Sequence, residues 1–223
     1  MQIDNVNIYN LAEAIAASGL SMMALYDRKD FGKKRQAIQA EALDPCDIQQ
    51  PDIKRAIRLA ANPAGTGHNN FLSGILVTAN VTATNAFWIQ CERYNFLQIV
   101  SSQRKMHCLR AMIDSKNAFF NDKTSCSIVH DFLDEMKDSK SEGINEEKLV
   151  YSCPLGLELT AHISTNYLQL KTIYFQRRNH KLLGWRDFCE WIEGLPLSFL
   201  ITNQTPEKNI DQIADDFISD WGE

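Results

Sequence analysis

The chain has 223 residues, of which 44% are hydrophobic and 23% are charged, and its formal net charge is -5 at pH 7. This balance is typical of a globular protein and excludes a wholly disordered chain or a fibrous repeat. The negative charge also argues against a general nucleic-acid binder, which needs a basic face for phosphate contacts. We expect one folded domain over residues 1–223, long enough to bury a core.

The start of the chain and its cysteines indicate the compartment. Residues 1–8 hold no cationic stretch followed by an apolar core, and no apolar run approaches membrane-spanning length. The six cysteines form no C-x-x-C pair and lack zinc-like histidine spacing, so neither a disulfide framework nor a metal site is predicted. We therefore expect a soluble, cytoplasmic protein with reduced thiols, no metal and no membrane contact.

The N-terminal third is predicted to be mainly helical. Residues 10–25 carry apolar side chains at helical spacing, and Asp52 is placed to cap a helix over 53–61. Between them lie the basic residues 33–35 and a loop around Pro45 and Pro51, and this stretch is predicted to be at the surface. We accordingly predict a helical N-terminal part over residues 1–65.

Two later segments have the pattern of half-buried strands. Residues 74–82 and 157–164 alternate apolar with polar side chains, and we expect both strands in one sheet. Helices are predicted over 103–120 and 128–136, followed by a charged connection over 137–148.

The second strand is followed by further helices. Helical spacing of apolar residues continues over 166–181 and 185–193, and the Gly194-Leu195-Pro196 segment then ends the helix. Residues 204–223 are acidic and are predicted to form a peripheral tail. Few strands among many helices indicate an α+β fold, with a small antiparallel or mixed sheet flanked by helices.

Two segments carry groups that can bind an anion. Residues 101–105 bring two serines, a glutamine and two cations to the predicted start of a helix, where free N–H groups and the helix dipole attract anions. The alternative is that a serine there only caps the helix. Arg177 lies in the second segment, 176–181; its guanidinium can bind phosphate or polarise a pyrimidine carbonyl, although a charged helix face is often simply solvated.

Two further segments have alternative interpretations. His68, in a glycine-containing loop, either contacts a ligand or pairs with a backbone carbonyl, and residues 88–93 either line a pocket or pair with other charges. The sequence has no P-loop, no dinucleotide-binding glycine motif, no nucleophile elbow and no Cys–His nucleophile pair. Covalent catalysis by the protein is therefore not expected.

Taken together, these segments resemble the flavin-dependent thymidylate synthases (ThyX). The signature of that family is an Arg-His-Arg triplet followed by seven residues and a serine, and Arg93 and Ser101 have this spacing. The family then has a Leu-Pro, a strand that ends at an asparagine, and an arginine eleven positions later. Pro154, Asn166 and Arg177 follow in the same order at the same spacing. The resemblance covers roughly half the chain and implies a single domain with the ThyX-like fold.

The resemblance implies a one-carbon transfer to C5 of a pyrimidine deoxynucleotide, dUMP or dCMP, with Arg177 as the catalytic group against the ring. It implies FAD as cofactor, NADPH and methylenetetrahydrofolate as co-substrates, and a homotetramer with shared sites. The implied nucleotide-binding residues are Arg93, Ser101, Ser102, Gln103, Arg104 and Arg177, and the implied flavin-binding residues are His68, Glu92, Asn166, Arg178 and His180.

Two departures from the signature leave alternatives open. Cys91 and Glu92 stand where the family has arginine and histidine, and a carboxylate beside a phosphate or a reduced flavin is unfavourable unless it is paired. The second hypothesis is therefore a non-catalytic nucleotide-binding or assembly protein that kept the fold and lost the flavin site. A third, less favoured, is a nucleic-acid-binding protein that uses residues 33–35 and 177–181.

Overall fold

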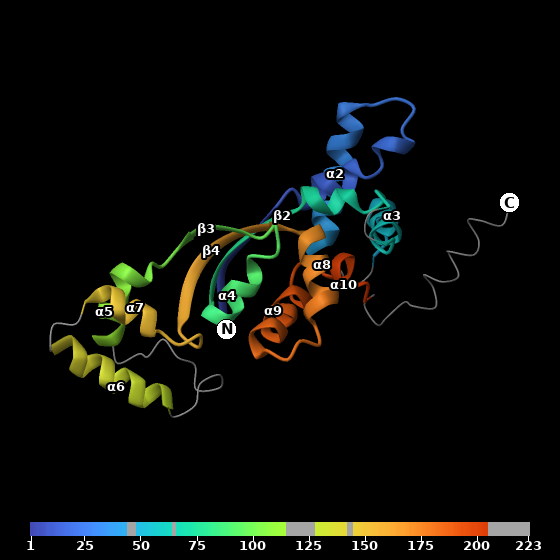
Figure 1. The fold of residues 1–223 in the computed structure, drawn as a ribbon. Helices are drawn as coiled ribbons and strands as arrows, with labels where there is room; N and C mark the ends of the chain where they lie inside the picture. Colours follow the sequence, from blue (N-terminus) through green and yellow to red (C-terminus); the bar gives the residue numbers. More distant parts are fainter. Residues whose placement is uncertain (44–47, 64–65, 115–127, 142–144, 205–223) are drawn as a thin grey trace. The chain divides into compact units, whose positions relative to one another are not determined.

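The computed structural model describes residues 1–43, 48–63, 66–114, 128–141 and 145–204 (Figure 1). The strands in this part of the chain are β1 (Gln2–Tyr9), β2 (Leu76–Thr84), β3 (Gln98–Ser102) and β4 (Glu158–Asn166). The helices are α1 (Leu11–Ala17), α2 (Arg28–Leu43), α3 (Pro51–Ala60), α4 (Asn85–Cys91), α5 (Lys105–Asp114), α6 (Ile128–Ser141), α7 (Glu146–Ser152), α8 (Tyr167–Arg177), α9 (Leu183–Glu193) and α10 (Phe199–Thr202), with 3-10 turns η1 (Leu20–Met22) and η2 (Asn70–Gly74).

The strands β2 and β4 form the centre of a sheet with the order β1-β2-β4-β3. Along both strands every second side chain is buried and the residues between are mostly half-buried. The buried set includes Val77, Ala79, Val81, Leu159, Ala161 and Ile163. The two predicted strands, their common sheet and the α+β class are therefore confirmed.

The opposite face of these two strands is polar. The Thr82 Oγ1 lies 2.7 Å from the Thr160 Oγ1, and the Asn80 Oδ1 lies 2.8 Å from the His162 Nδ1. The two pairs run in opposite directions along the chain, so β2 and β4 are antiparallel. β3 is also antiparallel to β4, and it pairs Ser101 with His162 after a bulge.

The chain divides into two compact units. The first comprises Met1–Asn7, Val77–Thr165 and Arg177–Phe188, and the second comprises Ile8–Leu76, Asn166–Gln176 and Cys189–Glu223. Most of the sheet belongs to the first unit, whereas α1, α2, α3 and most of α8 belong to the second. Within the described ranges, no helix is both long and apolar enough to cross a membrane.

The N-terminal helices differ from the prediction at their boundaries. The helix over 53–61 starts at Pro51, and the side chain of Gln50, not Asp52, caps it by accepting the N–H groups of Asp52 and Ile53. Proline suits the first helical position because it has no N–H that needs a partner. Asp52 instead pairs with Arg55 at 2.5 Å.

Six helices and strands were not predicted: β1, α2, α4, β3, α7 and α10. Helix α2 includes the basic residues 33–35 of the predicted surface stretch. Only Ile38 and Ala42 are buried along the helix, so its sequence shows little apolar periodicity. Helix α6 continues to Ser141, into the predicted charged connection. Charged residues such as lysine and glutamate favour the helical conformation even where the helix buries no side chains. Predicted helix residues 115–120 and tail residues 205–223 lie outside the described part of the chain.

Lys171 is a buried cation in the second unit. Its ammonium donates hydrogen bonds to the carbonyl of Ala60, at the end of α3, at 2.7 Å and to Asn203 Oδ1 at 2.5 Å. It also lies 5.6 Å from the centroid of the Phe175 ring. Burial lowers the pKa of Lys171 from 10.5 to about 8, because charge is disfavoured away from water.

This pKa predicts a specific pH dependence of stability. Between about pH 8 and pH 10.5 the unfolded chain holds a proton on Lys171 that the folded chain has released, so stability gains from this group as pH rises. We expect the free energy of unfolding of the native protein to rise by about 1–3 kcal/mol relative to Lys171→Met across this window. Urea unfolding of both proteins at pH 7.5, 9 and 10.5 measures the difference, and parallel pH profiles would contradict the prediction.

Candidate active site

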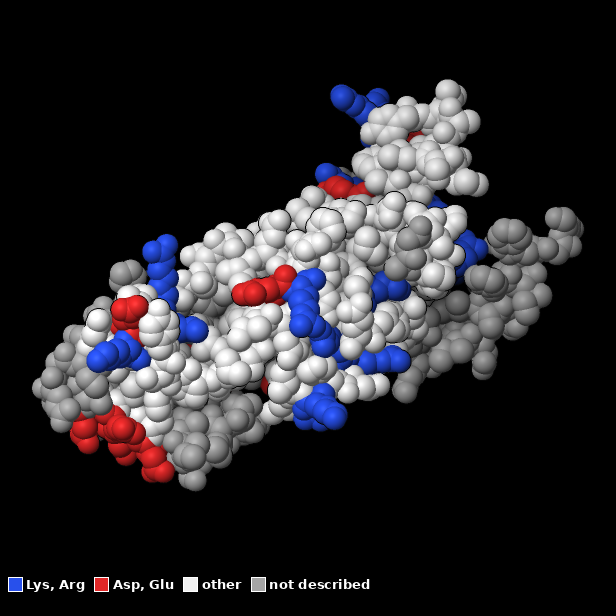
Figure 2. Space-filling view, viewed as in Figure 1, with Lys and Arg blue, Asp and Glu red and all other residues white. Residues whose placement is uncertain are grey.

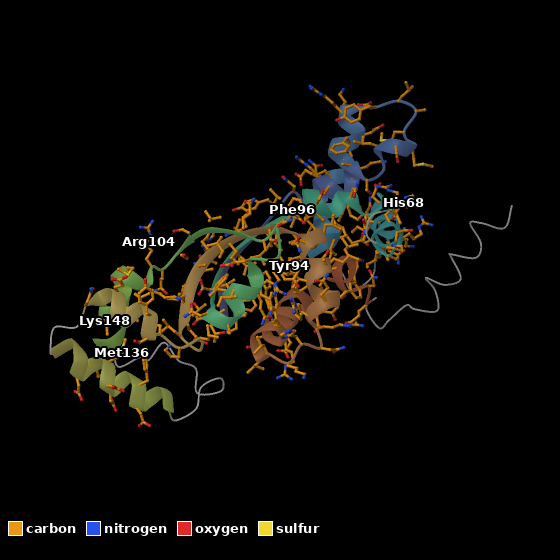
Figure 3. All side chains as sticks on the ribbon, in the orientation of Figure 1. His68, Tyr94, Phe96, Arg104, Met136 and Lys148 are labelled. Atoms are coloured by element: carbon orange, nitrogen blue, oxygen red, sulfur yellow. The ribbon has the colours of Figure 1, made fainter. Side chains whose placement is uncertain are left out.

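Arg177 is the last residue of α8, where a cation interacts favourably with the helix dipole. Its Nε donates a hydrogen bond to the Tyr94 Oη at 2.7 Å. The guanidinium carbon lies 5.0 Å from the Trp185 ring centroid and 5.7 Å from that of Tyr94. Tyr94 follows α4 in the chain, and Figure 3 marks its position. One hydroxyl and two aromatic faces therefore fix the orientation of this side chain.

A cluster of aromatic side chains supports Arg177. Trp185 has no exposed surface, and its ring centroid lies 4.4 Å from that of Phe87 on α4, 6.0 Å from Phe188 on α9 and 5.7 Å from Tyr94. The Trp185 indole N–H donates to Gln90 Oε1 at 2.7 Å. Helix α4 is itself held to the sheet, since the Trp88 Nε1 donates to the Leu159 carbonyl at 3.0 Å. The support is rigid because its polar atoms are paired and its rings are packed.

The charge in this cluster belongs to Arg177. Within the described residues, no carboxylate pairs with its guanidinium and Tyr94 accepts its only side-chain hydrogen bond. Burial raises the pKa of the Cys91 thiol far above its usual range, although the charge of Arg177 opposes that shift. Burial and, second, the charge of Arg177 lower the pKa of His180. At neutral pH the Cys91 thiol and the His180 ring are thus uncharged, and the guanidinium has four Nη–H donors available for an anion or a carbonyl.

The structure corrects one prediction about the nucleotide-binding segment. Ser101 and Ser102 lie in strand β3 and not at the start of a helix, because their backbone pairs with His162 and Ala161 of β4. Helix α5 starts later, at Lys105. Neither serine is therefore a helix cap, and the helix starts at the last residue of the predicted segment 101–105.

The other predicted nucleotide-binding residues lie around this strand and after α4. Gln103 continues the pairing of β3, since its backbone N–H donates to the Thr160 carbonyl and its side-chain oxygen accepts from the Thr160 N–H. Arg104 is exposed just before α5, at the position that Figure 3 labels. Arg93 is exposed just after α4. All three lie in the first unit together with Arg177.

The residues predicted to bind a flavin divide between the units. In the first unit, Glu92 and Arg178 are exposed and His180 is half-buried, with its ring centroid 6.4 Å from that of Trp185. In the second unit, His68 is exposed, and Asn166 caps α8 by accepting the Gln169 N–H at 2.8 Å. The described residues contain no group of three histidine, cysteine or acidic side chains that could hold a metal ion.

Tyr94 and Trp185 are the site residues that sequence reasoning missed. Tyr94 directly follows Arg93 in the signature region, but nothing local distinguishes it from any core aromatic residue. Its role depends on Arg177, which is 83 positions away in the chain. Only the three-dimensional contact identifies the pair.

Solved structures of other proteins match this fold. A crystal structure of the flavin dependent thymidylate synthase ThyX from Helicobacter pylori, complexed with FAD and dUMP, matches with a TM-score of 0.62 at 13% identity, over 91% of this chain and 99% of that chain. The chain has the ThyX fold. A second structure of the Helicobacter pylori ThyX with FAD and dUMP, at 2.31 Å resolution, matches at 0.60 and 12% identity, over 91% of this chain and 98% of that one. No protein-family model and no curated protein matches the sequence.

Proposed function

We propose that this protein is a ThyX-like enzyme that transfers a one-carbon unit to C5 of a pyrimidine deoxynucleotide, with dUMP as the first candidate and dCMP as the second. The observation that carries the proposal is Arg177, a cation without a carboxylate partner among the described residues, oriented by Tyr94 and Trp185. It stands at the spacing of the family's catalytic arginine. The solved ThyX structures with the same fold contain FAD and dUMP.

In this proposal Arg177 acts as an electrophile. Its Nη–H groups hydrogen-bond a pyrimidine carbonyl and stabilise the negative charge that develops on the ring as C5 becomes nucleophilic. The guanidinium has no ion pair among the described residues, which keeps its charge available for the ligand. The Cys91 thiol stays protonated because burial raises its pKa, so it does not serve as a nucleophile. Arg93, Ser101, Ser102, Gln103 and Arg104 are proposed to hold the nucleotide.

The first unit offers groups that fit a flavin. Arg178 suits the pyrophosphate. The His180 Nδ1 accepts the Leu182 N–H at 3.1 Å, so the ring's proton is on Nε2, a donor for a flavin carbonyl. Glu92 is exposed and solvated, so its carboxylate adds no desolvation cost of a buried charge to a flavin site. A bound FAD supplies the redox chemistry that methyl-group formation needs.

The remaining proposals come from the resemblance. His68 and Asn166 are proposed to contact the flavin as well. We further propose NADPH and methylenetetrahydrofolate as co-substrates, a homotetramer with shared sites, and a cytoplasmic location.

The first experiment is a visible absorbance spectrum of the purified protein with and without added FAD, followed by titration of dUMP and dCMP. We expect a bound flavin whose absorption bands are shifted by one of the two nucleotides, which names the substrate. Added FAD that stays free, with no flavin carried through purification, would contradict the enzyme proposal.

That negative result would favour the second candidate, a nucleotide-binding or assembly protein that has lost the flavin site. The specific observation behind this alternative is the chemistry of Cys91 and Glu92, a buried neutral thiol and an exposed carboxylate where the family has two basic residues. Nucleic-acid binding has less support. The formal net charge of -5 disfavours phosphate contacts, although a group of basic side chains lies at the centre of the viewed face (Figure 2).

A further inference from the structure

A row of four polar side chains crosses the open face of the sheet, one from each strand. Asp4 of β1 accepts a hydrogen bond from Asn80 Nδ2 of β2 at 3.1 Å, and Asn80 Oδ1 lies 2.8 Å from His162 Nδ1 of β4. Ser101 of β3 is the direct cross-strand partner of His162. Directly opposed residues of an antiparallel pair project to the same face, so Ser101 and His162 lie side by side there.

This row determines which nitrogen of His162 carries the proton. An ionised aspartate only accepts hydrogen bonds, so Asp4 must face the amide nitrogen of Asn80. The amide oxygen of Asn80 then faces His162, and Nδ1 must be the donor. A neutral His162 therefore has its proton on Nδ1 and an unprotonated Nε2. Nε2 is thus a hydrogen-bond acceptor whose direction is fixed through two strands.

Charge decides what this acceptor binds. Asp4 stands in the row, and Glu158 lies on the same face of β4, four residues from His162. Two carboxylates repel phosphate, so the row fits a neutral group that donates an N–H. The row is not a nucleophilic triad, because no hydrogen bond joins the described side chains of Ser101 and His162.

We infer that His162 is a pyrimidine-binding residue whose Nε2 accepts the N3–H of a uracil ring seated beside Ser101, with the Asp4–Asn80 pair holding the imidazole in the required tautomer. This inference rests on the proposed function, including its sites shared between subunits, in which Arg177 of one subunit and His162 of another face the same ring. It identifies the base edge that the site recognises. The phosphate of the same nucleotide would be bound by the exposed arginines before and after β3, Arg93 and Arg104.

The test compares binding of dUMP and N3-methyl-dUMP, which lacks the N3–H, to the full-length protein by calorimetry. We expect the native protein to bind dUMP about ten-fold more tightly than the methylated nucleotide, the equivalent of one hydrogen bond. The His162→Phe variant is expected to bind both nucleotides equally. Ser164→Ala removes a hydroxyl from the same face of the same strand, two residues away, and is expected to discriminate as the native protein does.

Each outcome is decisive. Tight dUMP binding without discrimination in the native protein, or discrimination that persists in His162→Phe, overturns the inference and leaves the proposed function standing. Binding of neither nucleotide overturns both. Nitrogen-15 NMR of the native protein gives a readout that needs no variant: a neutral His162 protonated on Nε2 instead of Nδ1 overturns the inference.

Discussion

Replacement of Arg177 with alanine is expected to lower kcat for dUMP by about 10²–10³-fold or more, the usual loss when an oriented donor to transition-state charge is removed. The fold should survive, because Arg177 is half-buried at the end of α8 and has no ion pair among the described residues. The binding of nucleotide should change much less than turnover, since the charge on the pyrimidine ring is largest in the transition state. Steady-state turnover and thermal unfolding of the variant measure the two expectations.

Conservative variants distinguish the contribution of the Arg177 charge from that of its orientation. Arg177→Lys keeps the charge but loses the planar fork, and Tyr94→Phe keeps the ring but loses the hydroxyl that accepts from Nε. Both are expected to retain more activity than Arg177→Ala, with Tyr94→Phe acting mainly on kcat. Arg186→Ala, an exposed arginine next to Trp185, is the matched control and should be close to native. Native turnover in Arg177→Ala would exclude the proposed mechanism.

The contrast between strands β4 and β3 illustrates how far the sequence predicts this fold. β4 buries every second side chain, so its period of two is visible in nine consecutive residues. β3 has five residues, all exposed, and is a strand only because β4 pairs with it. Two serines before a cationic helical stretch look locally like a helix cap, which is why the sequence favours a helix start where the structure has the end of β3.

The candidate site likewise contains one residue that the sequence predicts and others that depend on tertiary contacts. Arg177 was found from its spacing to Asn166, because both lie on one continuous strand-to-helix segment. Its partners Tyr94 and Trp185 lie on other elements, and the contact that selects them forms only when α4, α8 and α9 are in place. Local pattern reading thus identifies the reactive group, whereas the groups that orient it require the tertiary structure.

Replacement of Trp185 with alanine is expected to destabilise the protein by about 3–5 kcal/mol, the range for a large aromatic side chain removed from a packed core. Trp185 has no exposed surface, contacts Phe87 and Phe188, and donates its indole N–H to Gln90. Trp185→Phe keeps a ring but leaves Gln90 Oε1 without this donor, which costs about 1–3 kcal/mol.

The two Trp185 variants also test the link between core and site. Trp185 presents its ring 5.0 Å from the Arg177 guanidinium, and phenylalanine offers a weaker π face, so Trp185→Phe should lower kcat even at temperatures where it is fully folded. Tyr151→Ala, which removes a ring that is 79% exposed, is the control and should shift stability by no more than about 0.5 kcal/mol. Urea unfolding together with turnover at a temperature below every transition measures both effects. A loss of stability in Trp185→Phe without any loss of kcat would show that the indole supports the core alone, and that the Tyr94 hydroxyl suffices to orient Arg177.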